Sequence, residues 1–125
     1  MAATDPWPDA RDGAFPVHVA LRSIGEPLDW WRDQALRLEG AGYAGVACWD
    51  HFVSRGNPSD PVLEAWTTLT WAGAATTRLR LLPFVLNVMN RHPAVLARMA
   101  ATLQEATGGR LVIGLGIGGT GTGEA

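Results

Sequence analysis

The sequence predicts an α/β protein with parallel strands, and three observations support this class. Four short apolar segments alternate with three segments of helical periodicity, and the apolar segments begin roughly thirty residues apart. They lack clean alternation of apolar and polar residues, as is typical of strands buried on both faces. Connections of this length carry a crossover helix and make consecutive strands parallel. Part of a (β/α)8 barrel and a small doubly wound sheet both fit this pattern.

The four strands are expected at the apolar segments. Strands and helices then alternate along the chain, beginning and ending with a strand. In chain order they cover Phe15–Leu21, Gly45–Trp49, Leu79–Asn87 and Arg110–Leu115. In both architectures, functional sites form at the carboxyl ends of the strands. The residues that follow each strand are therefore the first candidates for a site.

Three helices are predicted between these strands. The first runs from about Leu28 to Ala41. The second is expected to begin at Asp60, which can cap the free amides, with Glu64 near the positive end of the helix. The third begins at His92-Pro93, and Gly108-Gly109 ends it.

Length, charge and cysteine content exclude several classes of protein. A complete barrel needs about 250 residues, and this chain has 125. The net charge of −2 gives no reason to expect nucleic acid or an anionic membrane as a partner. Cys48 is the single cysteine, which excludes an internal disulfide and fits a reducing compartment. No apolar run reaches the roughly 18 residues that a membrane span needs. We therefore expect a cytoplasmic protein.

The pair Asp50-His51, directly after the second strand, is the most chemically capable pair at a strand end. An imidazole titrates near neutral pH, so His51 could give or take a proton, and an adjacent carboxylate could hold it. The structural alternative is that Asp50 faces away and caps a turn while His51 is an ordinary loop residue. The neighbouring Cys48 reads as a small buried residue rather than a nucleophile. His92 fits a helix cap.

Glycines dominate the segment after the fourth strand. Gly116, Ile117 and Gly118 offer backbone N–H groups to which a phosphate or a flat ring could come close. Gly114, Gly116 and Gly119 match the spacing of a dinucleotide fingerprint, but the helix and the acidic residue that it requires are missing, so a nucleotide-binding domain is a distant alternative. The three histidines have no metal-ligand spacing, and we expect no metal site.

Four segments of the sequence together resemble the luciferase-like monooxygenase family, and more narrowly its coenzyme F420-dependent branch. They read GYAGVACWDHF, PSDPVLEAWTTLTWAGAAT, RLRLLPFVLNVMNRHPAVLARMAATL and GGRLVIGLGIG. The resemblance implies the N-terminal half of a (β/α)8 barrel, with a polar lead-in at residues 1–14, a partial barrel domain at 15–119 and an irregular tail at 120–125. It implies an oxidoreductase that transfers a hydride between a small-molecule substrate and C5 of the deazaflavin F420.

The resemblance also assigns site residues. It makes His51 the acid/base or hydrogen-bonding residue beside the deazaflavin ring, with Asp50 as its partner. It places a bulge, often with a non-prolyl cis peptide, at residues 83–87, so that Phe84, Val85 and Asn87 support the ring. It assigns Gly116, Ile117 and Gly118 to coenzyme binding. Relatives often have Gly-Thr where this chain has Leu82-Pro83, which leaves the details of ring support open.

Half a barrel leaves two strand edges and one sheet face uncovered, which favours association. We expect the chain to be inactive alone and to need a missing C-terminal half or a homodimer. A gene fragment, a frameshift and a deliberate truncation all fit the sequence. Two alternatives remain: an FMN-dependent luciferase-like monooxygenase, and a catalytically silent fragment or assembly module.

Overall fold

A computed structural model describes residues 15–54 and 56–118 of the chain. The predicted lead-in at residues 1–14 and the tail at 120–125 lie outside the described residues, as do Arg55 and Gly119. No helix among the described residues is long and apolar enough to cross a membrane.

The main sheet has three parallel strands in sequential order, as expected for βα units. They are β1 (His18–Leu21), β2 (Gly45–Cys48) and β3 (Arg80–Pro83). Leu81 of β3 also forms a parallel bridge to Leu111, so the segment after the last helix adds to the same edge. The first strand starts at His18 and not at Phe15, and the second ends before Trp49.

A bulge interrupts the third expected strand and splits it in two. The peptide bond between Phe84 and Val85 is cis, as the family resemblance predicted for this region. A second parallel ladder then pairs β4 (Leu86–Asn87) with β5 (Leu115–Gly116). Leu81 pairs with Leu111 and Leu86 with Leu115, so the β3–β4 side carries one residue more than its partner.

The prediction of a continuous strand over Arg110–Leu115 was therefore wrong. That segment pairs at Leu111, follows the bulge, and becomes a strand again only at Leu115. The extra residue opposite it is the physical reason, because a bulge breaks the ladder for both strands that border it.

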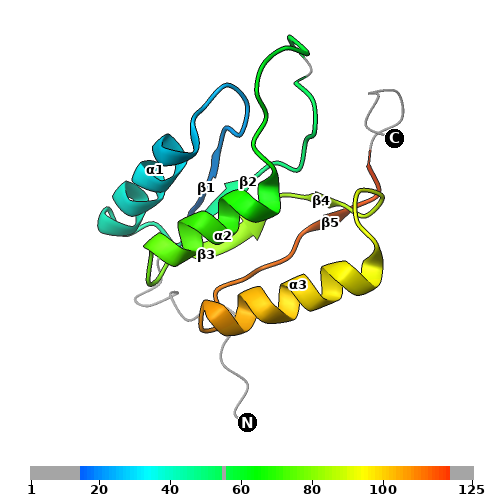
Figure 1. The fold of residues 1–125 in the computed structure, drawn as a ribbon. Coiled ribbons are helices and arrows are strands. Elements are labelled where there is room, and N and C mark those ends of the chain that lie inside the picture. The colour runs from blue at the N-terminus through cyan, green and yellow to red at the C-terminus, as the bar shows by residue number, and fades with distance from the viewer. Residues whose placement is uncertain (1–14, 55, 119–125) are drawn as a thin grey trace.

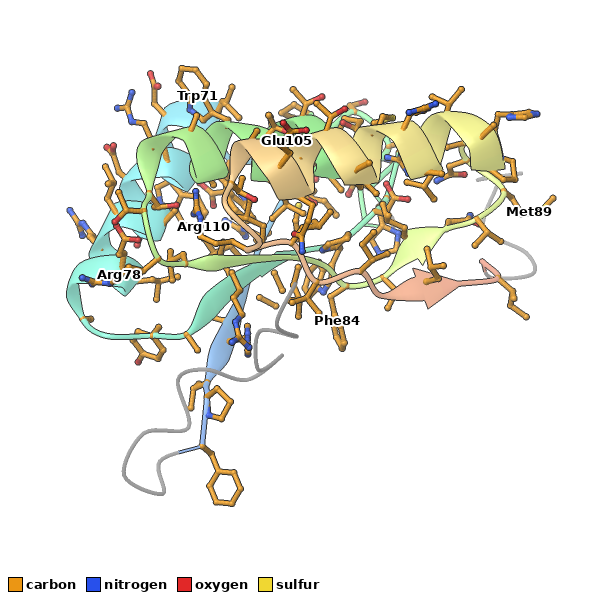
Figure 2. All side chains as sticks on the ribbon, turned by 90° about the horizontal axis from the view of Figure 1, so that it is seen from below. Trp71, Arg78, Phe84, Met89, Glu105 and Arg110 are labelled. Carbon is orange, nitrogen blue, oxygen red and sulfur yellow. The ribbon has the colours of Figure 1, made fainter. Side chains whose placement is uncertain are left out.

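Three helices cover one face of the sheet. They are α1 (Leu28–Gly40), α2 (Ala65–Ala75) and α3 (Pro93–Ala106). In Figure 1, α2 lies between α1 and α3, and in Figure 2 all three helices lie on one side of the strands. Figure 2 also shows Phe84 pointing away from the helices, on the uncovered side of the sheet.

The start of α2 differs from the sequence prediction. The helix begins at Ala65 and not near Asp60, because Glu64 is the cap: its carboxylate accepts the N–H groups of Trp66 and Thr67 at 3.0 and 2.7 Å. Asp60 instead accepts hydrogen bonds from Ser54 and Asn57 in the loop. The α3 cap was predicted correctly, since the His92 side chain accepts from the Ala94 N–H.

The hydrophobic core lies between the sheet and the helices. Trp31 and Leu69 from the helices pack with Val46, Cys48 and Leu81 from the strands, and all five are fully buried. Val46, Cys48 and Leu81 point to the helices. The neighbouring positions in the strands point to the other face of the sheet, away from the helices. One row of that face crosses β1, β2 and β3 at His18, Gly45 and Arg80.

Candidate functional site

The carboxyl end of β2 carries a buried ion pair. Asp50 follows β2 directly, and its side chain is fully buried. Its two oxygens accept hydrogen bonds from the two terminal nitrogens of Arg91 at 2.7 and 2.8 Å. Oδ2 also accepts the backbone N–H of Asn87 at 2.9 Å. This bidentate pair joins the end of β2 to the segment that follows β4.

Arg91 has a second carboxylate partner in Glu64. Its Nη2 donates to Glu64 Oε1, the same carboxylate that caps α2. The guanidinium carbon also lies 5.8 Å from the centre of the Phe52 ring. Only a tenth of the Arg91 side chain is exposed. We call Asp50, Glu64 and Arg91 the ion cluster.

The pKa values of Arg91 and Glu64 favour their charged states. Hydrogen bonding to Asp50 raises the pKa of Arg91 against the opposing effect of burial. Burial would raise the pKa of Glu64, but the amides of Thr67 and Trp66, together with Arg91, lower it below its ordinary value. Arg91 and Glu64 therefore stay ionised over the physiological range.

Cys48 is a core residue, as the sequence suggested. Its side chain is fully buried in the hydrophobic core. Burial, with the nearby charges of Glu64 and Asp50, raises the pKa of the thiol to about 12. A thiol that stays protonated at neutral pH is a poor nucleophile.

His51 lies between two residues that contact Arg91, namely Asp50 and Phe52. Its imidazole is half-buried and meets the Trp49 indole edge to face, with ring centres 6.4 Å apart and planes at 67°. His51 is therefore held at the carboxyl end of the sheet with part of its ring accessible. This is the exposure that a proton-transferring residue needs.

The bulge forms an apolar shelf next to this segment. The Phe84 N–H donates to the Cys48 carbonyl at 2.8 Å, which ties the bulge to the end of β2. Phe84 and Val85 are 57% and 42% exposed, although both are large apolar side chains. Exposed apolar side chains at the end of β3, tied to the end of β2, are suited to a flat ring.

Internal packing explains two of the glycines. A Cβ on Gly114 would lie 2.8 Å from Val85 Cγ1, and one on Gly116 would lie 2.6 Å from Val85 Cγ2. Real Cβ atoms do not come this close to their neighbours, so both glycines make room for the bulge. The group that comes close to the Gly116 backbone is thus the Val85 side chain of the same chain.

Asn87 connects the glycine segment to the ion cluster. Its backbone N–H donates to Asp50, and it pairs with Gly116 in the second ladder. Gly118 has a positive φ of 79°, and a Cβ there would lie 2.9 Å from the Asn87 amide group. Ile117 is 88% exposed between the two glycines.

All the site residues predicted from the sequence therefore lie at one end of the sheet. His51 and Asp50 follow β2, the bulge follows β3, and the glycine segment pairs with β4. No role was predicted for Arg91, and Glu64 was expected only to favour the positive end of a helix. Their signal was positional, because Arg91 follows a strand end and Glu64 precedes an apolar helix.

The described part of the chain shows no metal centre. Among residues 15–54 and 56–118, no three His, Cys, Asp or Glu side chains gather where they could hold a metal ion. A hollow of about 510 Å³ is lined by Phe15, Tyr43 and Arg78, at the other end of the strands. The candidate site therefore lies at the opposite end of the strands from this hollow.

Comparison with protein families gives one clear match. The model of the family described as luciferase-like monooxygenase matches residues 9–124, which is nearly the whole chain.

Two of the similar proteins differ in their chemistry. The 4-hydroxyprotoasukamycin monooxygenase of Streptomyces nodosus subsp. asukaensis is 34% identical over 111 residues, which cover 85% of this chain and 28% of that protein. The 5,10-methylenetetrahydromethanopterin reductase of Methanopyrus kandleri is 42% identical over 50 residues, which cover 40% of this chain and 14% of that protein.

The similar solved structures also include both a reductase and a monooxygenase. The coenzyme F420-dependent tetrahydromethanopterin reductase from Methanopyrus kandleri matches with a TM-score of 0.71 and 26% identity, over 86% of this chain and 28% of that one. The oxygenating constituent of 3,6-diketocamphane monooxygenase from Pseudomonas putida, in complex with FMN, matches with a TM-score of 0.70 and 20% identity, over 85% of this chain and 30% of that one. The chain spans less than a third of the length of each of these proteins.

Proposed function

The chain belongs to the luciferase-like monooxygenase family, and from this premise we propose that it carries the coenzyme-binding strand ends of an F420-dependent oxidoreductase acting on a small molecule. The observation that carries the proposal is the meeting of His51, the Phe84–Val85 bulge and the glycine segment at one end of the sheet. The similarity to an F420-dependent reductase structure supports the choice of coenzyme.

We propose further that the described sheet is the first half of a (β/α)8 barrel. Two features support this over a doubly wound sheet. The strands follow in sequential order without a reversal, and the three helices lie on one face (Figure 2). A doubly wound sheet reverses its strand order and carries helices on both faces. The uncovered face that bears Phe84 would then line the barrel interior.

The residues at this end fit a deazaflavin. F420 supplies a ring carbon, C5, that accepts or gives a hydride when the coenzyme is bound. Phe84 and Val85 present apolar surface on which such a ring would rest. His51 would hold or move a proton beside it, and the exposed backbone at Ile117 and Gly118 would meet the polar part of the coenzyme. Asp50 would act by holding the peptide that bears His51.

A second candidate is an FMN-dependent monooxygenase. The similarity to 4-hydroxyprotoasukamycin monooxygenase extends over most of the chain, and the same fold holds FMN in the diketocamphane enzyme. The apolar shelf at Phe84 and Val85 would suit the isoalloxazine ring equally well. The two candidates differ in the coenzyme that binds, so binding separates them.

The test is a titration of the purified full chain with F420 and, separately, with FMN, followed by the change in coenzyme fluorescence anisotropy. We expect F420 to bind and FMN not to bind at the same concentration. The His51→Asn variant should bind F420 more weakly. The matched control His92→Asn changes an exposed helix cap and should bind it as the unchanged chain does.

Each other outcome has a defined meaning. Binding of FMN without F420 would replace the proposal with the monooxygenase candidate. A folded chain that binds neither coenzyme would overturn both and favour a silent fragment or assembly module. Equal weakening by the two histidine variants would remove His51 from the proposed site.

A further inference from the structure

We infer that Arg91 is a positioning residue for His51, because it holds both chain neighbours of His51 on one guanidinium. The inference rests on the proposed function for its importance to the reaction. Its physical content concerns only residues of this chain, so it can be tested without any coenzyme.

The two neighbours of His51 contact Arg91 in different ways. Asp50 accepts two hydrogen bonds from its terminal nitrogens at 2.7 and 2.8 Å. Phe52 places its ring 5.8 Å from the guanidinium carbon. The peptide that carries the imidazole is therefore fixed on both sides by one group.

Arg91 is itself fixed from a third direction. Its Nη2 also binds Glu64, whose carboxylate is anchored on the first amides of α2. The guanidinium thus joins three segments that are far apart in the sequence: the end of β2, the start of α2 and the loop between β4 and α3. Through this one side chain, the neighbours of His51 are joined to the start of α2.

The chemistry of the contact requires arginine. The guanidinium is planar and offers a fork of donors that can bind one carboxylate with two bonds and a second carboxylate with a third. A lysine ammonium is a point charge and cannot reproduce the fork, although it preserves the charge. The variant Arg91→Lys therefore removes the positioning geometry and keeps the charge balance of the ion cluster.

The contact between His51 and Trp49 gives a readout of position. An indole ring 6.4 Å away displaces the magnetic resonance signals of the His51 ring protons from those of an unstructured histidine. The variant Trp49→Leu lacks the indole ring, so the change in the His51 signals in this variant measures the displacement that Trp49 causes. We expect Arg91→Lys to lose most of it in the full chain, as seen in proton–carbon correlation spectra.

The matched control is Arg110→Lys. Arg110 is another partly buried arginine with four hydrogen bonds, to Thr107, Thr76, Leu79 and Gly73, at the other end of the strands. It should lower stability without moving the His51 signals. If both lysine variants move the signals equally, the effect is general loosening and the inference is wrong.

A second pair of variants covers the case in which Arg91→Lys does not fold. Phe52 is 47% exposed, so Phe52→Leu removes its contact with Arg91 at small cost to the core. It should displace the His51 signals, whereas Val53→Ala, at an exposed position one residue further, should not. Unchanged signals in Phe52→Leu would contradict the inference. Failure of F420 to bind while these shifts occur as expected would contradict the proposed function alone.

Discussion

Two arginines hold the two ends of the sheet, and they do so by different means. Arg91, at the carboxyl ends of the strands, binds two carboxylates. Arg110, at the amino ends, donates within the described residues to three backbone carbonyls and one hydroxyl: Gly73 O, Leu79 O, Thr107 O and Thr76 Oγ1. Figure 2 shows Arg110 between the helices and the strands.

The difference fits our proposal that the amino end stabilises the fold and the carboxyl end carries the functional site. At the amino end, Glu39 reinforces the join by accepting the N–H groups of Thr77, Arg78 and Leu79. These contacts close the α2–β3 turn against α1. At the carboxyl end, charge is buried close to exposed apolar side chains and a half-buried histidine. Burial of charge costs free energy, and such arrangements are concentrated at functional sites.

The largest effect is expected for Arg91→Ala. Removing the guanidinium leaves the buried carboxylate of Asp50 with only the Asn87 amide, and loss of one partner of a buried ion pair costs about 3–5 kcal/mol. Urea unfolding of the variant and the unchanged chain measures this free energy. The double variant Asp50→Asn with Arg91→Met should recover part of the loss, since it removes the stranded charge. A double variant no more stable than Arg91→Ala would contradict the ion-pair explanation.

A smaller loss is expected for Arg110→Met. It removes no hydrogen bond to a carboxylate but leaves carbonyl groups without their donor, at about 1–3 kcal/mol for a buried group. The same urea experiment measures the loss, with Arg98→Met on the exposed side of α3 as the control. No single second substitution should restore it, because three of the four acceptors are main-chain atoms. A loss of unfolding free energy equal to that of Arg98→Met would show that the hydrogen bonds of Arg110 do not stabilise the amino end of the sheet.

Overpacking the glycine segment should have a comparable or smaller effect. Gly116→Ala places a Cβ against Val85 and should cost about 1–3 kcal/mol. Val85→Ala in the same chain should relieve part of this cost. Gly40→Ala, where a Cβ meets nothing within 4 Å, is the control and should be nearly neutral. If Val85→Ala brings no relief, the contact with the bulge is not the reason for glycine at this position.

The smallest expected effect is a pH dependence at the amino end. Burial opposes the charge of Glu39, but the amides of Arg78, Thr77 and Leu79 lower its pKa below the ordinary value. A lowered pKa in the folded state adds stability that is present above about pH 4.3 and is lost as the pH falls through the folded pKa. The Glu39→Gln variant should therefore lose less stability than the unchanged chain as the pH falls below about 4.3.

The control for this prediction is Glu105→Gln, which removes the same charge from an exposed position on α3 (Figure 2). Thermal unfolding at a series of pH values measures both variants. The same acid slope in Glu39→Gln as in the unchanged chain would show that the three amides do not stabilise its charge.

The sequence predicted those features of the fold that depend on local patterns. Helices α1 and α3 lie where apolar spacing and the His92-Pro93 pair placed them. It failed at the start of α2, where two carboxylates could serve as the cap. Glu64 caps α2 in place of Asp60 while also binding Arg91, 27 residues further along the chain.

The candidate site was likewise predicted only in part. The order of strands and motifs predicted that His51 and the glycine segment lie at one end of the sheet, and the family resemblance implied the bulge between them. The partners of Asp50 could not be predicted, because Arg91 lies 41 residues away and no local pattern marks a buried ion pair. The reason for Gly114 and Gly116 was also hidden, since it depends on the position of the Val85 side chain in three dimensions.

The most direct test of the division between the two ends is F420 binding by Arg91→Lys and Arg110→Lys, measured at temperatures where both variants are equally folded. We expect binding to weaken in Arg91→Lys and to stay near that of the unchanged chain in Arg110→Lys. Equal weakening in the two variants would contradict the assignment of the carboxyl end to function and the amino end to stability.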